Sequence, residues 1–390
     1  ANIRSVSMSL GEGPMSLDGD GVPPAKSSGG DSLRSEIAAK KQAAGDAIEL
    51  SEAELDLALR SLQQAGSAAH DELDWAALRA LLARSAHLPH KDWARTEAAA
   101  AELEALLSDP ADATFRDLFH RVLTDGNWPV AAQAAAARTA KPWVVLVTGV
   151  NGIRKTSAVY QPWFKTALSQ ALAEGGEGGE GGIPTEDLPD GNDSYFRQLD
   201  YMIATVANLE FKRLYKDFDD VEMYAAYKDA IFARWRTYAE MLGVLLLKAG
   251  KRQRMNVMVE TSGRDIAMFK YIDHFFPGEE YNKLVVHCTI NDIKFAESSV
   301  DGRMLGEMRQ GRAALAGSTR DVIAANAGGP YGSAVLKGVQ ADSDAVWESV
   351  RRGTAEGGAG RSWSKARLAI TAHESEPWTA RAVPADGRPT

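Results

Sequence analysis

Several features that mark secreted, membrane-spanning or nucleic-acid-binding proteins are missing from this sequence. Cys288 is the only cysteine, so no disulfide can form within the chain, which is typical of the cytoplasm or an organelle stroma and not of a secreted protein. No uninterrupted apolar run approaches the roughly 20 residues that a membrane-spanning helix needs. The formal net charge of −9, without a long basic block, argues against binding to a nucleic-acid backbone.

The sequence does have ample material for a core. With 390 residues, 45% of them hydrophobic, the length favours two or three domains. Residues 1–30 are rich in Gly, Ser, Pro and Asp, which predicts a tail that is disordered by itself and extended where a partner subunit holds it. Residues 1–10 contain Ser, Met and Arg but no acid, which is compatible with the remainder of a plastid transit peptide.

An all-α domain is predicted over residues 31–140. Apolar residues recur there at intervals of three and four, as in amphipathic helices. Ser51 and Glu54 form the sequence pattern of a capping box that opens a helix. These helices, with the N-terminal tail, offer surface to protein partners.

An α/β domain is predicted over residues 141–374, and a second tail over 375–390. Strands are expected at 143–148, 256–260, 284–290 and 367–371, because these are continuous apolar runs of the kind buried in parallel sheets. Helices are expected at 156–173, 194–216 and 221–249, with a flexible Gly/Glu loop at 174–182. Strands that alternate with helices predict a doubly wound, mostly parallel sheet.

The most informative stretch joins the strand at 143–148 to the helix behind it. Gly149, Lys155 and Thr156 fit the phosphate-binding loop G-x-x-x-x-G-K-[ST], in which backbone N–H groups wrap phosphates, the Lys reaches the outer phosphates and the hydroxyl group binds Mg²⁺. Arg154 replaces the second glycine, which puts catalysis in doubt or adds a positive charge to the phosphates. We expect ATP or another nucleoside triphosphate, with Mg²⁺, to bind Gly149, Asn151, Gly152, Arg154, Lys155, Thr156 and Ser157.

Three further residues are candidates for the same edge of the sheet. Glu260 ends an apolar strand and could bind Mg²⁺ through water or contact an acceptor, although Thr261 and Ser262 could instead be simple helix caps. Asp193 could be the base that takes a hydroxyl proton, or a helix N-cap. Arg303 could clamp the charge of a transferring phosphoryl group, or belong to a solvated helix face.

Taken together, the loop at 149–157, the segment Val259–Arg264 and the strand at Val285 with its Arg-bearing helix resemble the zeta-toxin-like branch of P-loop kinases. The resemblance covers roughly residues 141–320. It implies a P-loop NTPase fold in which an acid after the second strand is the base and lid arginines close on the phosphates. The roles implied for this chain fall on Lys155, Thr156, Asp193, Glu260 and Arg303. The loop also resembles that of the signal-recognition GTPases, but no guanine-selecting Lys-x-Asp motif follows.

Two functions follow from these observations. The first is an ATP-dependent phosphotransferase that acts on a small hydroxyl-bearing acceptor. The alternative is a catalytically degenerate subunit that keeps the P-loop fold for a structural or regulatory role in a larger assembly, which the substitution at Arg154 and the helical surface would favour.

Overall fold

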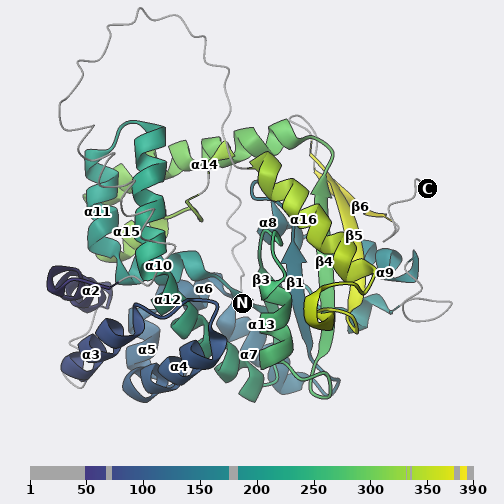
Figure 1. The fold of residues 1–390 in the computed structure, drawn as a ribbon, viewed down its shortest axis with the longest axis horizontal. Helices are drawn as coiled ribbons and strands as arrows, with labels where there is room; N and C mark the ends of the chain where they lie inside the picture. The colour runs from purple at the N-terminus through teal and green to yellow at the C-terminus, as the bar shows by residue number, and fades with distance from the viewer. Residues whose placement is uncertain are drawn as a thin grey trace, which may run out of the picture.

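The computed structural model describes residues 49–66, 73–174, 183–330, 332–333, 336–372 and 378–383. The expected tail at 1–30 and nearly all of the expected Gly/Glu loop lie outside these residues. Figure 1 shows a sheet with helices on both faces beside a cluster of helices built mainly from the first third of the chain.

A six-stranded sheet forms the centre of the α/β part, in the order β2-β3-β1-β4-β5-β6. Its first five strands are parallel and β6 is antiparallel to β5. The predicted α/β class with a mostly parallel sheet is therefore confirmed. The strands are β1 Trp143–Thr148, β2 Ser194–Arg197, β3 Asn256–Glu260, β4 Asn282–Ile290, β5 Ser364–Thr371 and β6 Thr379–Val383.

Burial on both faces explains why β1 reads as an unbroken apolar run. Val144 and Leu146 belong to one hydrophobic cluster, whereas Val145 and Val147 belong to the other. Because successive side chains of a strand point to opposite faces, each face of the sheet supplies one of the two cores. The first core also contains the buried apolar side chains of residues 52–66 and 73–137, so the N-terminal helices and the sheet share one continuous interior.

Two strands were not predicted. The helix expected at 194–216 begins instead with the strand β2, after which the chain forms α10 Leu199–Val206 and α11 Asn208–Asp217. The strand β6 lies within the expected tail at 375–390 and pairs with β5 from Thr371↔Thr379 to Arg367↔Val383. Both strands are short and both lie at an edge of the sheet, where the apolar signal is weakest.

Helices cover the sheet and build the rest of the molecule. The predicted capping box is confirmed, because the Ser51 side chain accepts from Glu54 N while the Glu54 carboxylate accepts from Ser51 N. The N-terminal helices are α2 Glu52–Ala65, α3 Trp75–Ser85, α4 Trp93–Leu107, α5 Ala113–Leu118, α6 His120–Asp125 and α7 Trp128–Ala137. The others are α8 Lys155–Ala158, α9 Phe164–Glu174, α12 Val221–Arg252, α13 Ala267–Phe275, α14 Ile293–Ala314, α15 Thr319–Ala325 and α16 Leu336–Arg351.

Candidate functional site

The loop between β1 and α8 is shaped by two glycines that no other residue could replace. Gly149 has φ +132°, and a Cβ atom built on it would lie 2.3 Å from the carbonyl oxygen of Cys288. Gly152 has φ +85°, and its Cβ atom would lie 2.4 Å from the carbonyl oxygen of Ala296 on α14. The loop is therefore in tight contact with the end of β4 and with α14.

Arg154 adopts a backbone conformation that usually favours glycine. Its backbone is left-handed, with φ 63° and ψ 31°, and it precedes the first residue of α8. A non-glycine residue in this region costs about 1–2 kcal/mol, so the surrounding contacts impose the turn. The guanidinium group lies over the ring of Phe295 on α14, 5.4 Å from its centroid. The loop thus makes a left-handed turn into α8 at a residue that is not glycine.

Lys155, Thr156 and Glu260 form one connected group at the carboxyl edge of the sheet. The buried Lys155 amine donates to Val150 O at 2.7 Å and lies 3.3 Å from Oε1 of Glu260. The Thr156 hydroxyl group donates to Oε2 of the same carboxylate. Because β3 pairs with β1 in register, Val147 lies opposite Glu260, which places the carboxylate directly beside the loop.

Unpaired backbone donors line the same loop. No N–H group from Val150 to Arg154 donates a hydrogen bond within the described part of the chain, and the first N–H groups of α8 have no helical partner. Asn151 is half-buried and Ser157 is exposed, so both side chains are accessible. Free N–H groups and a Lys suit phosphate oxygens, and one carboxylate with one hydroxyl group suits a Mg²⁺ ion that takes its other ligands from water and phosphate. The residues present therefore fit a Mg–nucleotide.

Helix capping does not account for the segment after Glu260. The α13 helix begins at Ala267, whose N–H group is bonded to Asp265 and not to Thr261 or Ser262. Thr261 N donates to Val147 O, and Ser262 O accepts from Gly149 N at 3.4 Å. These bonds hold the end of β3 against β1 and the loop.

Asp193 is not brought to this edge. It precedes β2, where Ser194 lies opposite Asn256 at the start of β3, so Asp193 is about 17 Å along the strand direction from the level of Glu260. Its carboxylate accepts from Asp190 N, the Ser194 hydroxyl group and the Asn256 amide. Asp193 thus stabilises a turn at the amino edge of the sheet, and neither the expected role as base nor that of a helix N-cap agrees with this place.

Asp200 occupies the place that was expected of Asp193. It follows β2 in the first turn of α10, and its carboxylate has no ion pair or hydrogen bond among the residues described. Burial raises the pKa of Asp200, the charge of Glu260 adds to this rise, and Lys228, Arg303 and Arg236 oppose it. The sequence signal is an acid at a strand-to-helix junction, but the pattern of residues 194–216 predicts helix throughout and conceals this junction.

Arg303 lies beside Asp200 and not in a solvated face. It projects from α14, which Figure 1 shows running along the top of the molecule from α11 and α15 toward the sheet. The half-buried guanidinium group makes no ion pair with any described residue, and its Nη2 is 3.5 Å from Gly329 O. Arg303 and Asp200 both reach the backbone of Gly328, which sequence reasoning missed although Gly328-Gly329-Pro330 is a turn signal.

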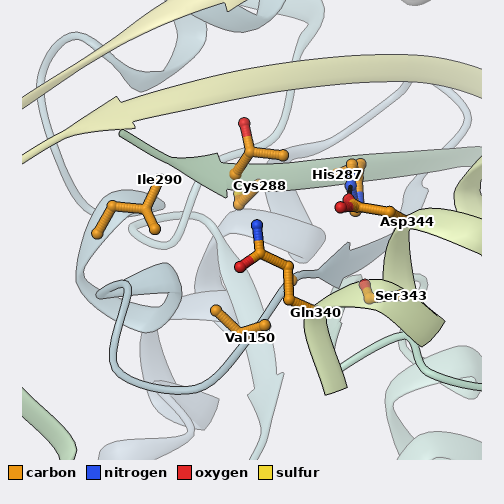
Figure 2. Close-up of a pocket in the computed structure, with 9 residues that line it drawn as sticks. Val150, His287, Cys288, Ile290, Gln340, Ser343 and Asp344 are labelled. Carbon is orange, nitrogen blue, oxygen red and sulfur yellow. Dashed lines mark hydrogen bonds and ion pairs between the residues drawn. The ribbon is translucent and has the colours of Figure 1, made fainter. Parts of the chain in front are cut away.

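A second group of polar residues lies behind the loop. His287 on β4 is buried and bonded at both nitrogens: Nδ1 is 3.0 Å from the Thr148 hydroxyl group and Nε2 is 3.1 Å from Asp344 Oδ1. Its ring stacks on Trp347 at 4.9 Å. Figure 2 shows His287 and Asp344 beside a small hollow that Val150, Cys288, Ile290, Gln340 and Ser343 also line. This group ties α16 to the residue that precedes Gly149.

Cys288 behaves as the sequence predicts of a lone cysteine in a strand. Its side chain is buried, and burial raises the pKa of its thiol to about 12. A thiol with so high a pKa is a poor nucleophile at neutral pH.

Comparison with known proteins does not assign this chain to a family. No model of a protein family matches this chain, and no curated protein matches it significantly. Within the described ranges, His, Cys, Asp and Glu side chains do not gather in threes into a protein-only metal cage. Nor does any helix described here combine the length and the apolar composition needed to cross a bilayer.

Proposed function

We propose that this chain binds a Mg–nucleotide at the loop 149–157 and transfers its terminal phosphoryl group to the hydroxyl group of a small acceptor. The observation that carries the proposal is the bond network of Glu260, which joins the Thr156 hydroxyl group and the Lys155 amine beside a loop with free N–H groups. The strand order supports it as well, because ligands of doubly wound sheets bind at the carboxyl ends of the central strands.

In this proposal, different residues bind the phosphates, the metal ion and the acceptor. Lys155 and the loop N–H groups would hold the phosphates, while Thr156 and Glu260 would hold Mg²⁺, which supplies charge neutralisation on the transferring group. Asp200 would take the acceptor's proton, because a buried carboxylate with a raised pKa is a stronger base than an exposed one. Its neighbour Arg303 would position the acceptor.

The rival function is the subunit that keeps the fold without catalysis. Arg154 is the observation that favours it, since its side chain stands where a loop of this kind has no side chain at all. The two functions differ in one measurable respect, which is whether nucleotide binds.

Calorimetric titration with Mg-ATP and Mg-GTP tests the proposal. Saturable binding by the parent protein, weakened at least tenfold in Lys155→Ala, is the expected result. Lys216→Ala is the matched control, because Lys216 is exposed at the end of α11 and lies outside the site. Equal binding by Lys155→Ala and the parent would sink the proposal, and no binding at millimolar nucleotide would favour the scaffold. In that case Arg154→Gly should gain affinity.

A further inference from the structure

We propose that the acceptor carries an anionic group, a phosphate or a carboxylate, that binds Arg303 and the backbone N–H groups of Gly328 and Gly329 beside Asp200. This inference rests on the proposed function, because only a phosphotransferase has an acceptor. The anion site itself can be tested without nucleotide.

The side chains of Arg303 and Asp200 both lie close to Gly328. A Cβ atom built on Gly328 would lie 2.9 Å from Nη1 of Arg303 and 3.5 Å from Oδ2 of Asp200. The two side chains therefore approach the same small space from opposite elements, α14 and α10, and they form no ion pair with each other. An anion on Arg303 would hold a neighbouring hydroxyl group within reach of the Asp200 carboxylate.

The charges around Asp200 identify Arg303 as the cation that is open to a ligand. Lys228 is paired with Glu307 at 2.7 Å, and Arg236 is paired with Glu240 at 2.9 Å. The one hydrogen-bond partner of the Arg303 guanidinium group among the described residues is a carbonyl oxygen, Gly329 O. A guanidinium group presents a planar fork of donors that matches the oxygens of a phosphate or carboxylate.

Backbone donors add to this cation. In the described part of the chain the N–H groups of Gly328 and Gly329 donate no hydrogen bond, and Gly328 has φ +131°. Backbone N–H groups without a partner are donors that an anion can use. The two residues before this segment are held in place, because Ala327 N donates to Glu307 at 2.8 Å and the buried Asn326 amide donates to Asp200 O at 3.1 Å.

The position of Arg303 on α14 separates it from the loop. Ala296 contacts Gly152, and Arg303 is about 10 Å further along the same helix, toward the helical side of the molecule. The acceptor's anion would then bind apart from the nucleotide phosphates, with Asp200 beside the anion.

Titration with inorganic phosphate tests the anion site in a background where the loop is impaired. The three proteins are Lys155→Ala, Lys155→Ala/Arg303→Gln and Lys155→Ala/Arg309→Gln; Arg309 is an exposed arginine of the same helix and serves as the matched control. We expect phosphate affinity to fall at least tenfold with Arg303→Gln and to be unchanged with Arg309→Gln. Equal phosphate binding by the two double variants, or no binding by Lys155→Ala, would overturn the anion site.

A second measurement connects the site to turnover. ADP release from Mg-ATP by the parent protein should increase with glycerol 3-phosphate and not with glycerol, and Arg303→Gln should remove the increase. Stimulation by both compounds alike would overturn the requirement for an anion. Failure of the parent to bind Mg-ATP would defeat the proposed function alone, since Arg303-dependent phosphate binding would still be observed.

Discussion

The carboxylate of Glu260 accepts a hydrogen bond from the hydroxyl group of Thr156. The two residues are far apart in the sequence, one at the end of β3 and the other in α8, and the parallel pairing of β3 with β1 brings them together. The second carboxylate oxygen lies beside the buried Lys155 amine. A metal ion bound to Thr156 would therefore meet a carboxylate that is already held in position.

The first prediction concerns Glu260→Gln. The amide has the shape of the carboxylate but lacks its charge, so we expect the fold to persist and the dependence of ATP affinity on Mg²⁺ to fall at least tenfold. Calorimetric titration with ATP, in Mg²⁺ and in EDTA, measures this dependence. Glu279→Gln is the control, because Glu279 is exposed before β4. Unchanged Mg²⁺ dependence in Glu260→Gln would exclude Glu260 as a metal ligand.

The second prediction concerns Asp200→Asn, which should lose activity and gain stability. If Asp200 is the base, ADP release stimulated by glycerol 3-phosphate should fall by about 10²–10⁴-fold. Burial raises the pKa of Asp200, so the charged carboxylate destabilises the folded protein at every pH above the ordinary value of 3.8. The variant should therefore have a higher Tm than the parent at pH 8.

The gain in Tm should shrink as the pH approaches 4, because the parent's carboxyl group is then protonated in the folded state. Thermal unfolding at several pH values measures the difference. The exposed Asp342 provides the control variant Asp342→Asn, which should change neither quantity. Full turnover in Asp200→Asn would rule out the base.

The sequence predicted the centre of the sheet well. The strands β1, β3, β4 and β5 are buried apolar runs, and burial on both faces is the physical condition that produces such runs. Glu260 and Lys155 could be placed together for the same reason, since parallel strands deliver their carboxyl ends to one edge. The backbone conformation at Arg154 could not be predicted. The conformational preference of a non-glycine residue disfavours the left-handed region, which the surrounding contacts impose here.

The acceptor side could not be derived in the same way. Asp200, Arg303 and Gly328 come from three separate elements, and no local pattern links them. The error at Asp193 came from β2, whose four residues carry an arginine and a serine and do not stand out from the helices around them. Asp193 precedes this strand and Asp200 follows it, so without the strand the two acids could not be assigned to the amino and carboxyl edges of the sheet.

The third prediction concerns the buried ion pair of Lys228 and Glu307, both of which are 1% exposed. The Glu307 carboxylate also accepts from the Tyr224 hydroxyl group at 2.6 Å. Glu307→Ala leaves an uncompensated buried ammonium group, so we expect the free energy of unfolding to fall by about 3–5 kcal/mol. The double variant Lys228→Met/Glu307→Leu removes both charges and should recover much of the loss. Urea denaturation measures all three proteins, and a double variant less stable than Glu307→Ala would contradict this account.

The fourth prediction concerns His287. Burial lowers the pKa of its imidazole, and this effect exceeds the opposite effect of the Asp344 carboxylate, which raises the pKa. Glu348 also raises this pKa, whereas Arg367 on β5 lowers it. Asp344 can only accept, so Nε2 carries a proton; because the lowered pKa disfavours a second proton, Nδ1 accepts from the Thr148 hydroxyl group. His287 is thus neutral in the folded protein.

Below the ordinary pKa of 6.5 the unfolded chain binds a proton that the folded protein resists. The stability that His287 contributes is therefore complete above pH 6.5 and decreases as the pH falls toward 5. We expect His287→Gln to cost about 1–3 kcal/mol at pH 7.5, because Thr148 and Asp344 lose a matched partner, and to cost less at pH 5. Chemical denaturation at both pH values tests this, with the exposed His87→Gln as the control. A cost that grows toward pH 5 would mean that the imidazole is charged in the fold, and that Asp344 outweighs burial.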